Sequence, residues 1–502
     1  MNEMMLVPIL LPAIAGILLL ISSFLGHFGK RKKAENLRAV RIFAVAVLIV
    51  SVVFALSLAW TGDRELTLFT LVDRIPVAFR IDGIGRLFIT IVSIVWLAAL
   101  VYSLVYMKKE GEEKRYYGFY LLLYGVLAGL DFSGNLITMY LFYELMTLVS
   151  MPLVLHNGTK ESIMAALKYL FYSMCGAYGG LFGIFFLYRF CDSFAFQVGG
   201  TLNLSLVAGN EGVLLIAVFS MLIGFGAKAG MFPLHAWLPA AHPVAPSPAS
   251  AVLSGIIVKS GVLAIIRTVF YIVGPEFLRG TWVQKVWMVL TLVTVFMGSL
   301  LAYREKGFKK RLAYSTVSQV SYILFGLSLL TPAAFAGALI HTVAHALIKC
   351  GLFLTAGVFL FKYEFTRVDQ LTGMGKKMPG LMWCYTILSL GLIGIPPTGG
   401  FISKWYLAEG ALDSGIRIFS LLGPVVLLVS ALLTAGYLLP ITMKGFFPGE
   451  DWEKAAGPIQ REEPPAGMLL PILVLSVLVV LMGVFPGGLI DYVSGLAVTL
   501  LR

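Results

Sequence analysis

The sequence has few charged residues for its length. Of its 502 residues, 59% are hydrophobic and only 13% are Asp, Glu, Lys or Arg, whereas soluble proteins have about 25% charged residues. This scarcity excludes a chain of several soluble domains, and it also excludes disordered and collagen-like proteins. The composition is instead that of a polytopic membrane protein, because one spanning helix needs about 20 mainly apolar residues.

Cysteine is also scarce, and its pattern excludes several cofactors. Four cysteines are present, all in apolar stretches: Cys175, Cys191, Cys350 and Cys384. No CxxC pair occurs, so neither an iron–sulfur cluster nor a structural zinc is encoded, and we interpret the four as small buried hydrophobic residues. A GxxxxGK[ST] loop is missing as well, which argues against ATP as the energy source. We expect no cofactor and no metal in this chain.

Apolar runs separated by charged or Gly/Pro-rich breaks predict an all-α protein with about fourteen transmembrane helices. The expected spans are 4–25, 39–60, 84–106, 116–132, 134–155, 163–188, 213–243, 247–273, 283–302, 312–330, 333–360, 379–412, 419–443 and 468–490. The first should be a retained helix, not a cleaved signal peptide. Its head carries Glu3 and no Lys or Arg, and the basic cluster Lys30–Lys33 follows the apolar run.

The net charge of +12 comes from basic residues that are concentrated in alternate loops. Alternate loops hold 23 Lys and Arg, in 30–41, 108–115, 160, 304–311, 362–377 and 444–461. The opposite loops and ends hold 9, including Arg74 and Arg502. Because Lys and Arg are enriched in cytoplasmic loops, this asymmetry predicts a multi-pass protein of a prokaryotic plasma membrane with both termini outside.

Basic residues also occur inside the expected spans: Lys168, Lys228, Lys259, Arg267, Lys349 and Lys404. Arg267 is near a helix end and is expected to snorkel outward. A lysine at the bilayer centre costs ~2.5–3.5 kcal/mol, and we count Glu144 as the one deep carboxylate that could offset the other five. Ion pairs that only hold helices together would therefore account for one or two lysines at most. We interpret the set as a hydrated path for ions.

Two expected spans cannot be continuous helices. Residues 225–248 contain five prolines after Lys228, and residues 391–406 contain two prolines and two glycines just before Lys404. Paired breaks at membrane depth indicate inverted repeats around a cavity, although proline kinks that only aid packing are an alternative. We expect five parts: an N-terminal three-helix segment (1–115), a first inverted repeat (116–273), a connecting helix (274–311), a second repeat that shares packing with it (312–443), and a loop with the last helix (444–502).

Residues 341–350, HTVAHALIKC, place three titratable groups at intervals of four. His341, His345 and Lys349 therefore lie along one helix face, over ~12 Å at ~1.5 Å per residue. Such a file is suited to a proton relay with intervening water. A metal site is the less favoured interpretation, because only Cys350 would add a further ligand.

Three motifs resemble the proton-translocating, antiporter-like subunits of respiratory complex I, of Mrp-type multisubunit sodium/proton antiporters and of membrane-bound hydrogenases. They are AKAGMFPLHAWLPAAHPVAPSPASAVLSGIIVKSGVLAIIR (227–267), HTVAHALIKCGLFL (341–354) and PPTGGFISKW (396–405). The resemblance covers roughly 115–445 and is strongest to the D-type Mrp subunit and its archaeal membrane-bound hydrogenase or sulfur-reductase counterpart. It implies fourteen helices, two inverted five-helix repeats, and breaks in helices 7 and 12.

The resemblance also implies a set of proton-translocating residues. By motif they are Glu144, Lys168 (of less certain role), Lys228, Lys259, His341, His345, Lys349 and Lys404. Within this set, Glu144 is expected to pair with Lys228, and Lys259 is the central lysine. In the family these groups form two half-channels joined by a hydrated polar axis.

The function implied is that of an ion-translocating subunit of a redox-driven complex, with no redox chemistry in this chain itself. Iron–sulfur clusters, and nickel–iron in a hydrogenase, are expected in partner subunits. The expected partners are other antiporter-like and small multispan membrane subunits, a peripheral redox module, protons, Na+ as a second candidate ion, and the lipid bilayer, but no nucleic acid. The alternatives are a subunit of a non-redox Mrp-type sodium/proton antiporter, an independent solute carrier, and a structural membrane anchor.

Overall fold

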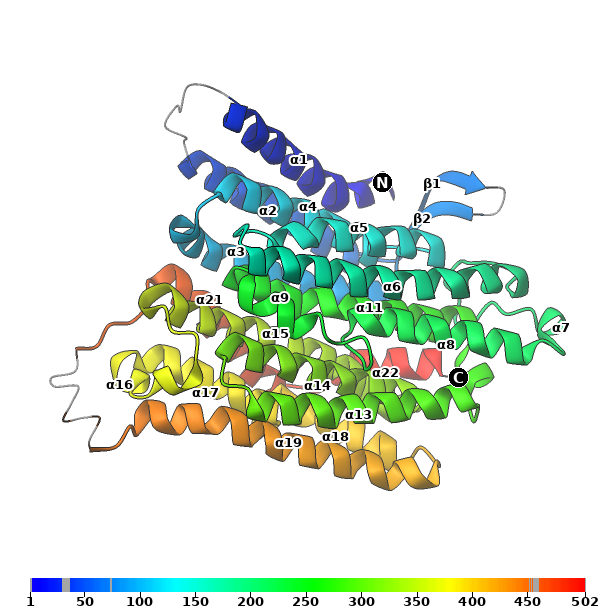
Figure 1. Cartoon of the computed structure of the whole chain (residues 1–502). Coiled ribbons are helices and arrows are strands. Elements are labelled where there is room, and N and C mark those ends of the chain that lie inside the picture. The colour runs from blue at the N-terminus through cyan, green and yellow to red at the C-terminus, as the bar shows by residue number, and fades with distance from the viewer. Residues whose placement is uncertain are drawn as a thin grey trace.

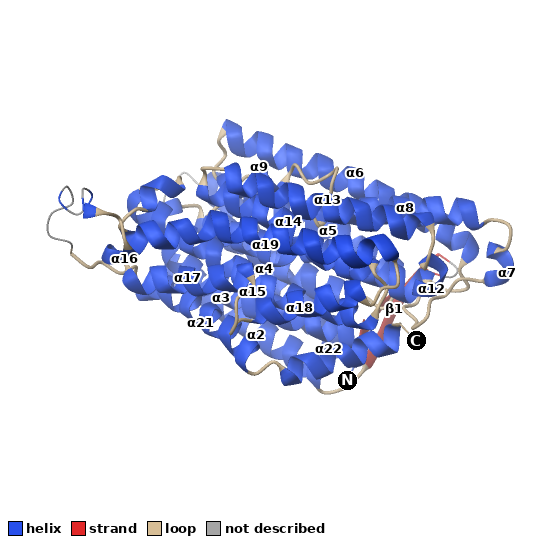
Figure 2. Ribbon diagram, turned by 90° about the horizontal axis from the view of Figure 1, so that it is seen from below, coloured by secondary structure: helices blue, strands red, loops and turns tan. Residues whose placement is uncertain are grey.

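The computed structural model of the chain describes residues 2–28, 37–72, 75–450, 452, 454 and 460–501. The basic cluster Lys30–Lys33, Arg74 and Arg502 lie outside the described residues. Long helices run roughly side by side along one direction (Figure 1). The N-terminus, the C-terminus and a β-hairpin lie at one end of this bundle, and α16 (Met374–Lys377) lies at the other (Figures 1 and 2). Both termini are thus at the same end, as the charge pattern predicts.

The elements follow the chain in three groups. The first consists of η1 (Asn2–Leu6), α1 (Val7–Phe28), α2 (Leu37–Trp60), β1 (Arg64–Val72), β2 (Ile75–Ile81) and α3 (Gly83–Glu110). The second consists of α4 (Glu113–Asp131), α5 (Leu136–Val154), α6 (Lys160–Phe190), α7 (Leu204–Val207), α8 (Glu211–Lys228), α9 (Leu238–Val244), α10 (Ser247–Val252), η2 (Leu253–Ile257), α11 (Val258–Ile266), η3 (Arg267–Val273) and α12 (Pro275–Leu278). The third consists of α13 (Trp282–Arg304), α14 (Phe308–Ser328), α15 (Pro332–Tyr363), η4 (Val368–Leu371), α16, α17 (Pro379–Ile393), α18 (Gly399–Leu412), α19 (Arg417–Phe446), α21 (Ala466–Val484) and α22 (Gly487–Leu500).

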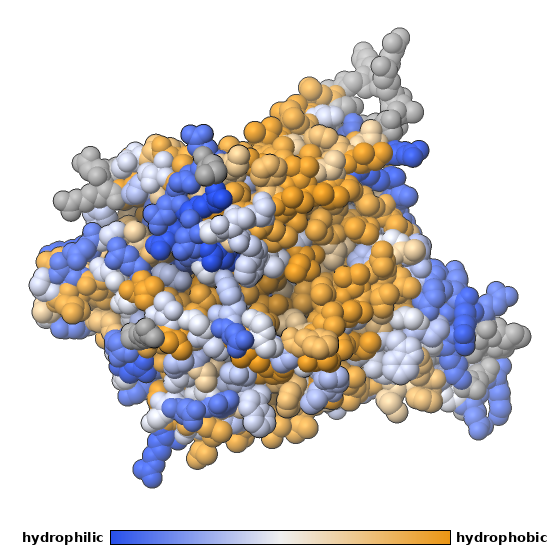
Figure 3. All heavy atoms as spheres, turned by 180° about the vertical axis from the view of Figure 1, so that it is seen from behind, coloured by the Kyte–Doolittle hydropathy of each residue, from blue (hydrophilic) through white to orange (hydrophobic). Residues whose placement is uncertain are grey.

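The all-α membrane fold predicted from the sequence is confirmed. Within the described residues, 11 helices are long and apolar enough to cross a membrane. The three remaining expected spans are also helical, as α4, α14 and the pair α17–α18. The count of fourteen spans stays a prediction. On the face seen in Figure 3, a broad apolar band is flanked by hydrophilic side chains at both ends, as expected for a protein surrounded by lipid.

Both predicted helix breaks are present. Residues 229–237 separate α8 from α9, and residues 394–398 separate α17 from α18. Side chains bind backbone carbonyls that the breaks leave free: the Trp237 indole N–H donates to Ala227 O (2.9 Å), and the Lys404 ammonium donates to Leu392 O (2.7 Å). The backbone groups next to each break therefore find partners within the protein.

Three features were not predicted from the sequence. Strands β1 and β2 pair in an antiparallel hairpin that buries Val77, Phe79 and Ile81 on one face. Hydropathy alone places this stretch in a loop, because its alternation averages out over a helical window. The last expected span also ends early, at Val484, and a separate helix, α22, follows. Finally, η2 and η3 are π-helical turns on either side of α11.

The core is built around α15 and the continuous helical segment Ser247–Val273. Helix α15 packs against α3, α10, α14, α17, α18, α21 and α22. All residues of Ser247–Val273 are buried, and this segment combines α10, η2, α11 and η3. The two most enclosed stretches of the bundle are thus those that contain Lys259 and the His341–Lys349 file. A π-turn adds one residue to a helical turn and is frequent at functional sites.

Candidate functional site

Lys228 lies in a cage of hydroxyl groups between α5, α6 and α8. Its ammonium donates to Thr147 Oγ1 (2.8 Å), Ser173 Oγ (2.8 Å) and the Tyr169 hydroxyl (3.1 Å), and the side chain is fully buried. Close packing of α6 on α8 brings these groups together: a Cβ at Gly176 would be 2.4 Å from Gly224 O. Uncharged hydroxyls, rather than a carboxylate, therefore solvate this lysine.

Glu144 lies near this cage but does not touch Lys228. It is half-buried on α5, and Tyr140 donates a hydrogen bond to its Oε1 (2.8 Å). Thr147, which accepts from Lys228, is one helical turn further along α5. The pair expected from the resemblance is therefore not a direct contact in this structure. Each charge is instead bound by a hydroxyl group of α5, Glu144 by that of Tyr140 and Lys228 by that of Thr147.

At the centre of the molecule, Lys259 contacts His345. Lys259 Nζ is 2.6 Å from His345 Nδ1, and it also donates to Ser254 O (2.8 Å). Both side chains are at most 2% exposed. The second nitrogen of the imidazole, Nε2, is buried and has no partner among the described residues. This ring can therefore exchange a proton with the lysine on one side and has an unused nitrogen on the other.

The file continues from His345 toward the second helix break. The rings of His345 and His341 are 6.0 Å apart, and His341 Nδ1 is 2.9 Å from Ser403 Oγ on α18. Tyr322 stacks on His341 (5.6 Å between centroids), and Lys404 Nζ lies 5.0 Å from the centre of the same tyrosine ring. The imidazole file and the lysine that follows the break thus share one aromatic side chain.

Lys349, the third member of the predicted stripe, points to a different neighbour. Its ammonium donates to Leu312 O (3.0 Å) and to the Ser315 hydroxyl, both on α14. A step of four residues rotates ~400° around a helix, so the stripe drifts and Lys349 turns away from the imidazoles. The structure therefore groups His341 and His345 with Lys259, and places Lys349 beside that group as a branch toward α14.

The prediction for Arg267 is wrong, and Lys168 is not enclosed by this chain. Lys168 is exposed on the outer face of α6, on the same side as Cys175, which is also exposed. Because Lys168 and Cys175 are seven residues apart, they lie on the same face of α6. Only the packing of the helix determines whether this face points outward. Arg267 does not snorkel. It is 2% exposed and forms a bidentate ion pair with Asp82, the N-cap of α3, between the rings of Phe196 and Tyr271.

Two further buried titratable residues were not among the predicted site residues. Asp131, at the end of α4, is 2% exposed, and its Oδ2 has no partner among the described residues. Together with Lys259, Ser260 and Thr342 it lines a small internal cavity. Glu144 is thus not the only deep carboxylate, although Asp131 falls inside the expected span 116–132. The other is His242, which is fully buried against Phe353 with neither ring nitrogen hydrogen-bonded in the described part of the chain.

This arrangement has the chemistry to pass protons. Among the described residues, no group of three or more His, Cys, Asp or Glu side chains is arranged to hold an ion. Instead, amines, imidazoles, hydroxyls and a carboxyl group follow one another through the protein interior. Several buried nitrogens lack a hydrogen-bond partner in the described structure, and ordered water is the usual partner of such groups.

The chain matches two family models. The model described as NADH:quinone oxidoreductase/Mrp antiporter, TM, covers residues 133–434, and the one described as the N-terminus of chain 5 of NADH-ubiquinone oxidoreductase (complex I) covers residues 70–117. Among curated proteins, subunit N of NADH-quinone oxidoreductase from Desulforudis audaxviator is 34% identical over 432 residues, which is 82% of this chain and 83% of that protein. The D-type component of the Na+/H+ antiporter from Bacillus subtilis is 29% identical over 513 residues, with 100% of this chain and 98% of that protein covered.

A solved structure has the same fold. A chain of the Mrp complex from Dietzia sp. DQ12-45-1b superposes with a TM-score of 0.85 at 22% identity, covering 100% of this chain and 98% of that one. At this identity the likeness concerns the fold alone. It extends over the whole length of this chain.

Proposed function

Because this chain belongs to the NADH:quinone oxidoreductase/Mrp antiporter transmembrane family, we propose that it moves protons along a buried axis as an antiporter-like subunit of a redox-driven, multisubunit membrane complex. The observation that carries the proposal is the 2.6 Å contact between Lys259 Nζ and His345 Nδ1 in the middle of the bundle. An amine and an imidazole at this distance can hand over one proton directly.

The axis has two halves. The first consists of Glu144 and the hydroxyl cage of Lys228. The second runs from Lys259 through His345 and His341 to Lys404, with Lys349 as a side branch toward α14. Lys168 is outside the axis because its side chain is exposed on α6. Rearrangement of charge at Glu144 would change the electrostatic potential at Lys228. A change of charge on each lysine would then change the potential at the next lysine along the axis.

The proposed division into repeats follows the two breaks. Residues 116–273 form the first repeat and residues 312–443, with the connecting helix of 274–311, the second. In each, an unbroken helix packs along half of a broken one, α6 on α8 and α15 on α18. Residues 1–115 and 444–502 flank the repeats. Lys228 comes directly before the first break, and Lys404 follows the second. The ammonium group of each lysine binds polar groups inside the protein.

The assembly is proposed from the relatives. NADH-quinone oxidoreductase and the Mrp antiporter are multisubunit membrane systems, so we expect this chain to function with further membrane subunits in a prokaryotic plasma membrane, with its termini outside. Iron–sulfur clusters, and nickel–iron in a hydrogenase, would belong to a peripheral redox partner. Relatives of both the redox and the antiporter type are found, and co-purification of subunits that contain iron–sulfur clusters supports the redox assembly. A complex without them would indicate the Mrp type and Na+ exchange.

The experiment is proton transport by the purified complex in liposomes, with Lys259→Met in this chain. Methionine fills nearly the same volume but has no titratable group, so we expect proton transport to fall by at least about tenfold, or ~1.4 kcal/mol of barrier. Lys285→Gln, at an exposed lysine at the start of α13, is the matched control and should transport normally. Full transport by an assembled Lys259→Met complex would refute the proposed axis.

A further inference from the structure

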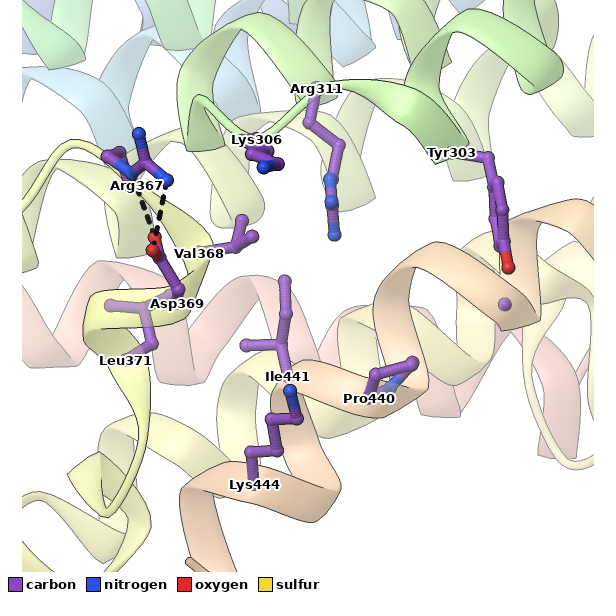
Figure 4. A pocket seen from close by; sticks show the side chains of 11 residues that line it. Tyr303, Lys306, Arg311, Arg367, Val368, Asp369, Leu371, Pro440, Ile441 and Lys444 are labelled. Carbon is purple, nitrogen blue, oxygen red and sulfur yellow. Dashed lines mark hydrogen bonds and ion pairs between the residues drawn. The ribbon is translucent and has the colours of Figure 1, made fainter.

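A basic pocket that the proposed axis does not use lies at the end of the bundle where α13 and α19 end. Its volume is about 430 Å³, within the range of ligand sites. It is lined by Tyr303, Lys306, Arg311, Arg367, Val368, Asp369, Leu371, Gly436, Pro440, Ile441 and Lys444. Four of these side chains are basic and one is acidic. Figure 4 shows Arg311 and Lys444 pointing toward one another across the pocket, from opposite walls.

The positive charge in this pocket is not neutralised by the described residues. Asp369, the acidic residue of the lining, is already bound by the Arg367 guanidinium through two hydrogen bonds of 3.0 Å. These bonds hold the pKa of Asp369 below its ordinary value, so the carboxylate stays ionised. The nearby Glu305 carboxylate accepts from Lys310 (3.0 Å), which is outside the lining. Lys306, Arg311 and Lys444 therefore share the pocket without a carboxylate partner in the described part of the chain.

Arg311 is the residue that makes this a built site. It is only 9% exposed, and it is fixed in place because Nε donates to Glu305 O and one terminal nitrogen donates to Tyr437 O (both 2.8 Å). A guanidinium that is buried without an anion is costly unless a ligand supplies the negative charge. Its planar fork matches the oxygens of a phosphate group, which it can bind with two hydrogen bonds.

The position of the pocket favours an amphiphilic ligand. Gly436, Pro440 and Lys444 follow one another at intervals of four along α19, and Leu432, one turn before Gly436, is 66% exposed on the apolar surface. Helix α13 contributes Tyr303, which is 51% exposed and whose ring lies close against Gly436. A shallow apolar track thus leads from the lipid-facing surface to the basic groups.

We propose that this pocket binds the phosphate group of an anionic ligand, namely the headgroup of an anionic phospholipid. The basic residues come from loops 304–311, 362–377 and 444–461, which belong to the lysine- and arginine-rich side of the protein. Basic pockets between helices on this side of membrane proteins are typical headgroup sites. The ligand would fill the gap between α13, η4 and α19 and hold these elements together.

The test is lipid binding by the intact detergent-purified complex. Native mass spectrometry would follow dioleoylphosphatidylglycerol, which is anionic, and dioleoylphosphatidylcholine, which carries the same phosphate but no net charge. The variant is Lys306→Gln combined with Lys444→Gln, because both side chains are exposed and their loss should not affect folding. Arg304→Gln removes a charge from the same end of the bundle, outside the lining, and is the matched control.

We expect the wild-type complex to retain phosphatidylglycerol and not phosphatidylcholine. The double variant should bind phosphatidylglycerol about 25-fold more weakly, which corresponds to about 1 kcal/mol per lysine, and Arg304→Gln should change binding less than about twofold. Equilibrium dialysis with radioactive inorganic phosphate distinguishes a lipid headgroup from a soluble phosphate as the ligand. Variant-sensitive binding of inorganic phosphate without lipid retention would assign the site to a soluble phosphate. The proposal would be overturned if the complex retained both lipids equally. It would also be overturned if the double variant bound phosphatidylglycerol and inorganic phosphate as the wild type does.

Discussion

Lys259 and His345 are 86 residues apart in the sequence and meet at 2.6 Å in the most enclosed part of the bundle. Lys259 lies on α11, between two π-helical turns, and His345 lies on α15. Neither side chain has a carboxylate partner within the described structure, so the charge that one of them carries must be stabilised by the other, by backbone carbonyls and by water. This contact is the first link in the second half of the proposed proton path.

His345→Gln tests that link. Glutamine approximates the size of the imidazole and can accept a hydrogen bond from Lys259, but it cannot take up a proton near neutral pH. We expect proton transport in liposomes to fall by at least about tenfold, with the complex still assembled. Val358→Ala, a small truncation at a buried position on the same helix, controls for general loosening. Wild-type flux in His345→Gln would remove this residue from the path.

Glu144→Gln tests the other end of the axis. The substitution keeps an acceptor for the Tyr140 hydroxyl but removes the charge that acts on the nearby Lys228. We expect strongly reduced coupled proton transport, by about tenfold or more, with normal assembly. Tyr140→Phe, which leaves the carboxylate but removes its hydrogen bond, should have a smaller effect. The measurement is the number of protons moved per electron, and a normal ratio in Glu144→Gln would contradict the assignment.

The parts of this site that were predictable from sequence are those that depend on one helix alone. The breaks after Lys228 and before Lys404 follow from proline chemistry, and the His341–His345 spacing follows from helical periodicity. The outward direction of Lys168 was not predictable, because a helix with polar residues on two faces does not indicate which face meets lipid. The hydroxyl cage around Lys228 also escaped notice, since serine, threonine and tyrosine are common in membrane helices and only packing brings three of them to one ammonium.

The same limit applies to the charge inventory. Asp131 and Arg267 both lie near the ends of expected spans, where charged residues normally reach water. In the structure, the hairpin, the loop after η3 and the start of α3 cover that end of the bundle, and these residues become buried. The hairpin was not predicted, so the enclosure that it helps to form could not be foreseen either.

Asp131→Asn tests whether the missed carboxylate takes part in transport. Asparagine has the same size, so the cavity shared with Lys259 should keep its shape, while the charge and the exchangeable proton are lost. We expect proton transport to decrease by about three- to tenfold, ~0.7–1.4 kcal/mol, and the decrease to be non-additive with Lys259→Met because both residues line one cavity. Leu127→Ile, a volume-conserving change in the same lining, is the control. Additive losses would show that Asp131 acts independently of Lys259.

Asp82→Asn addresses stability rather than transport. Asp82 accepts from both terminal nitrogens of Arg267 and, through Oδ1, from Gly85 N at the start of α3. Asparagine retains the helix cap but leaves the buried guanidinium without its counter-charge, and breaking a buried ion pair in this way costs about 3–5 kcal/mol. We expect a clearly lower unfolding temperature of the detergent-purified complex, with the proton-to-electron ratio unchanged in the fraction that stays folded. Arg86→Gln, which removes a more exposed ion pair with Asp63 at the same end, should lower stability by less than about 1 kcal/mol. If both variants unfold at the wild-type temperature, the Arg267–Asp82 pair does not stabilise this end of the bundle. If Asp82→Asn instead remains stable but changes the proton-to-electron ratio, the pair belongs to the transport path through the neighbouring Asp131.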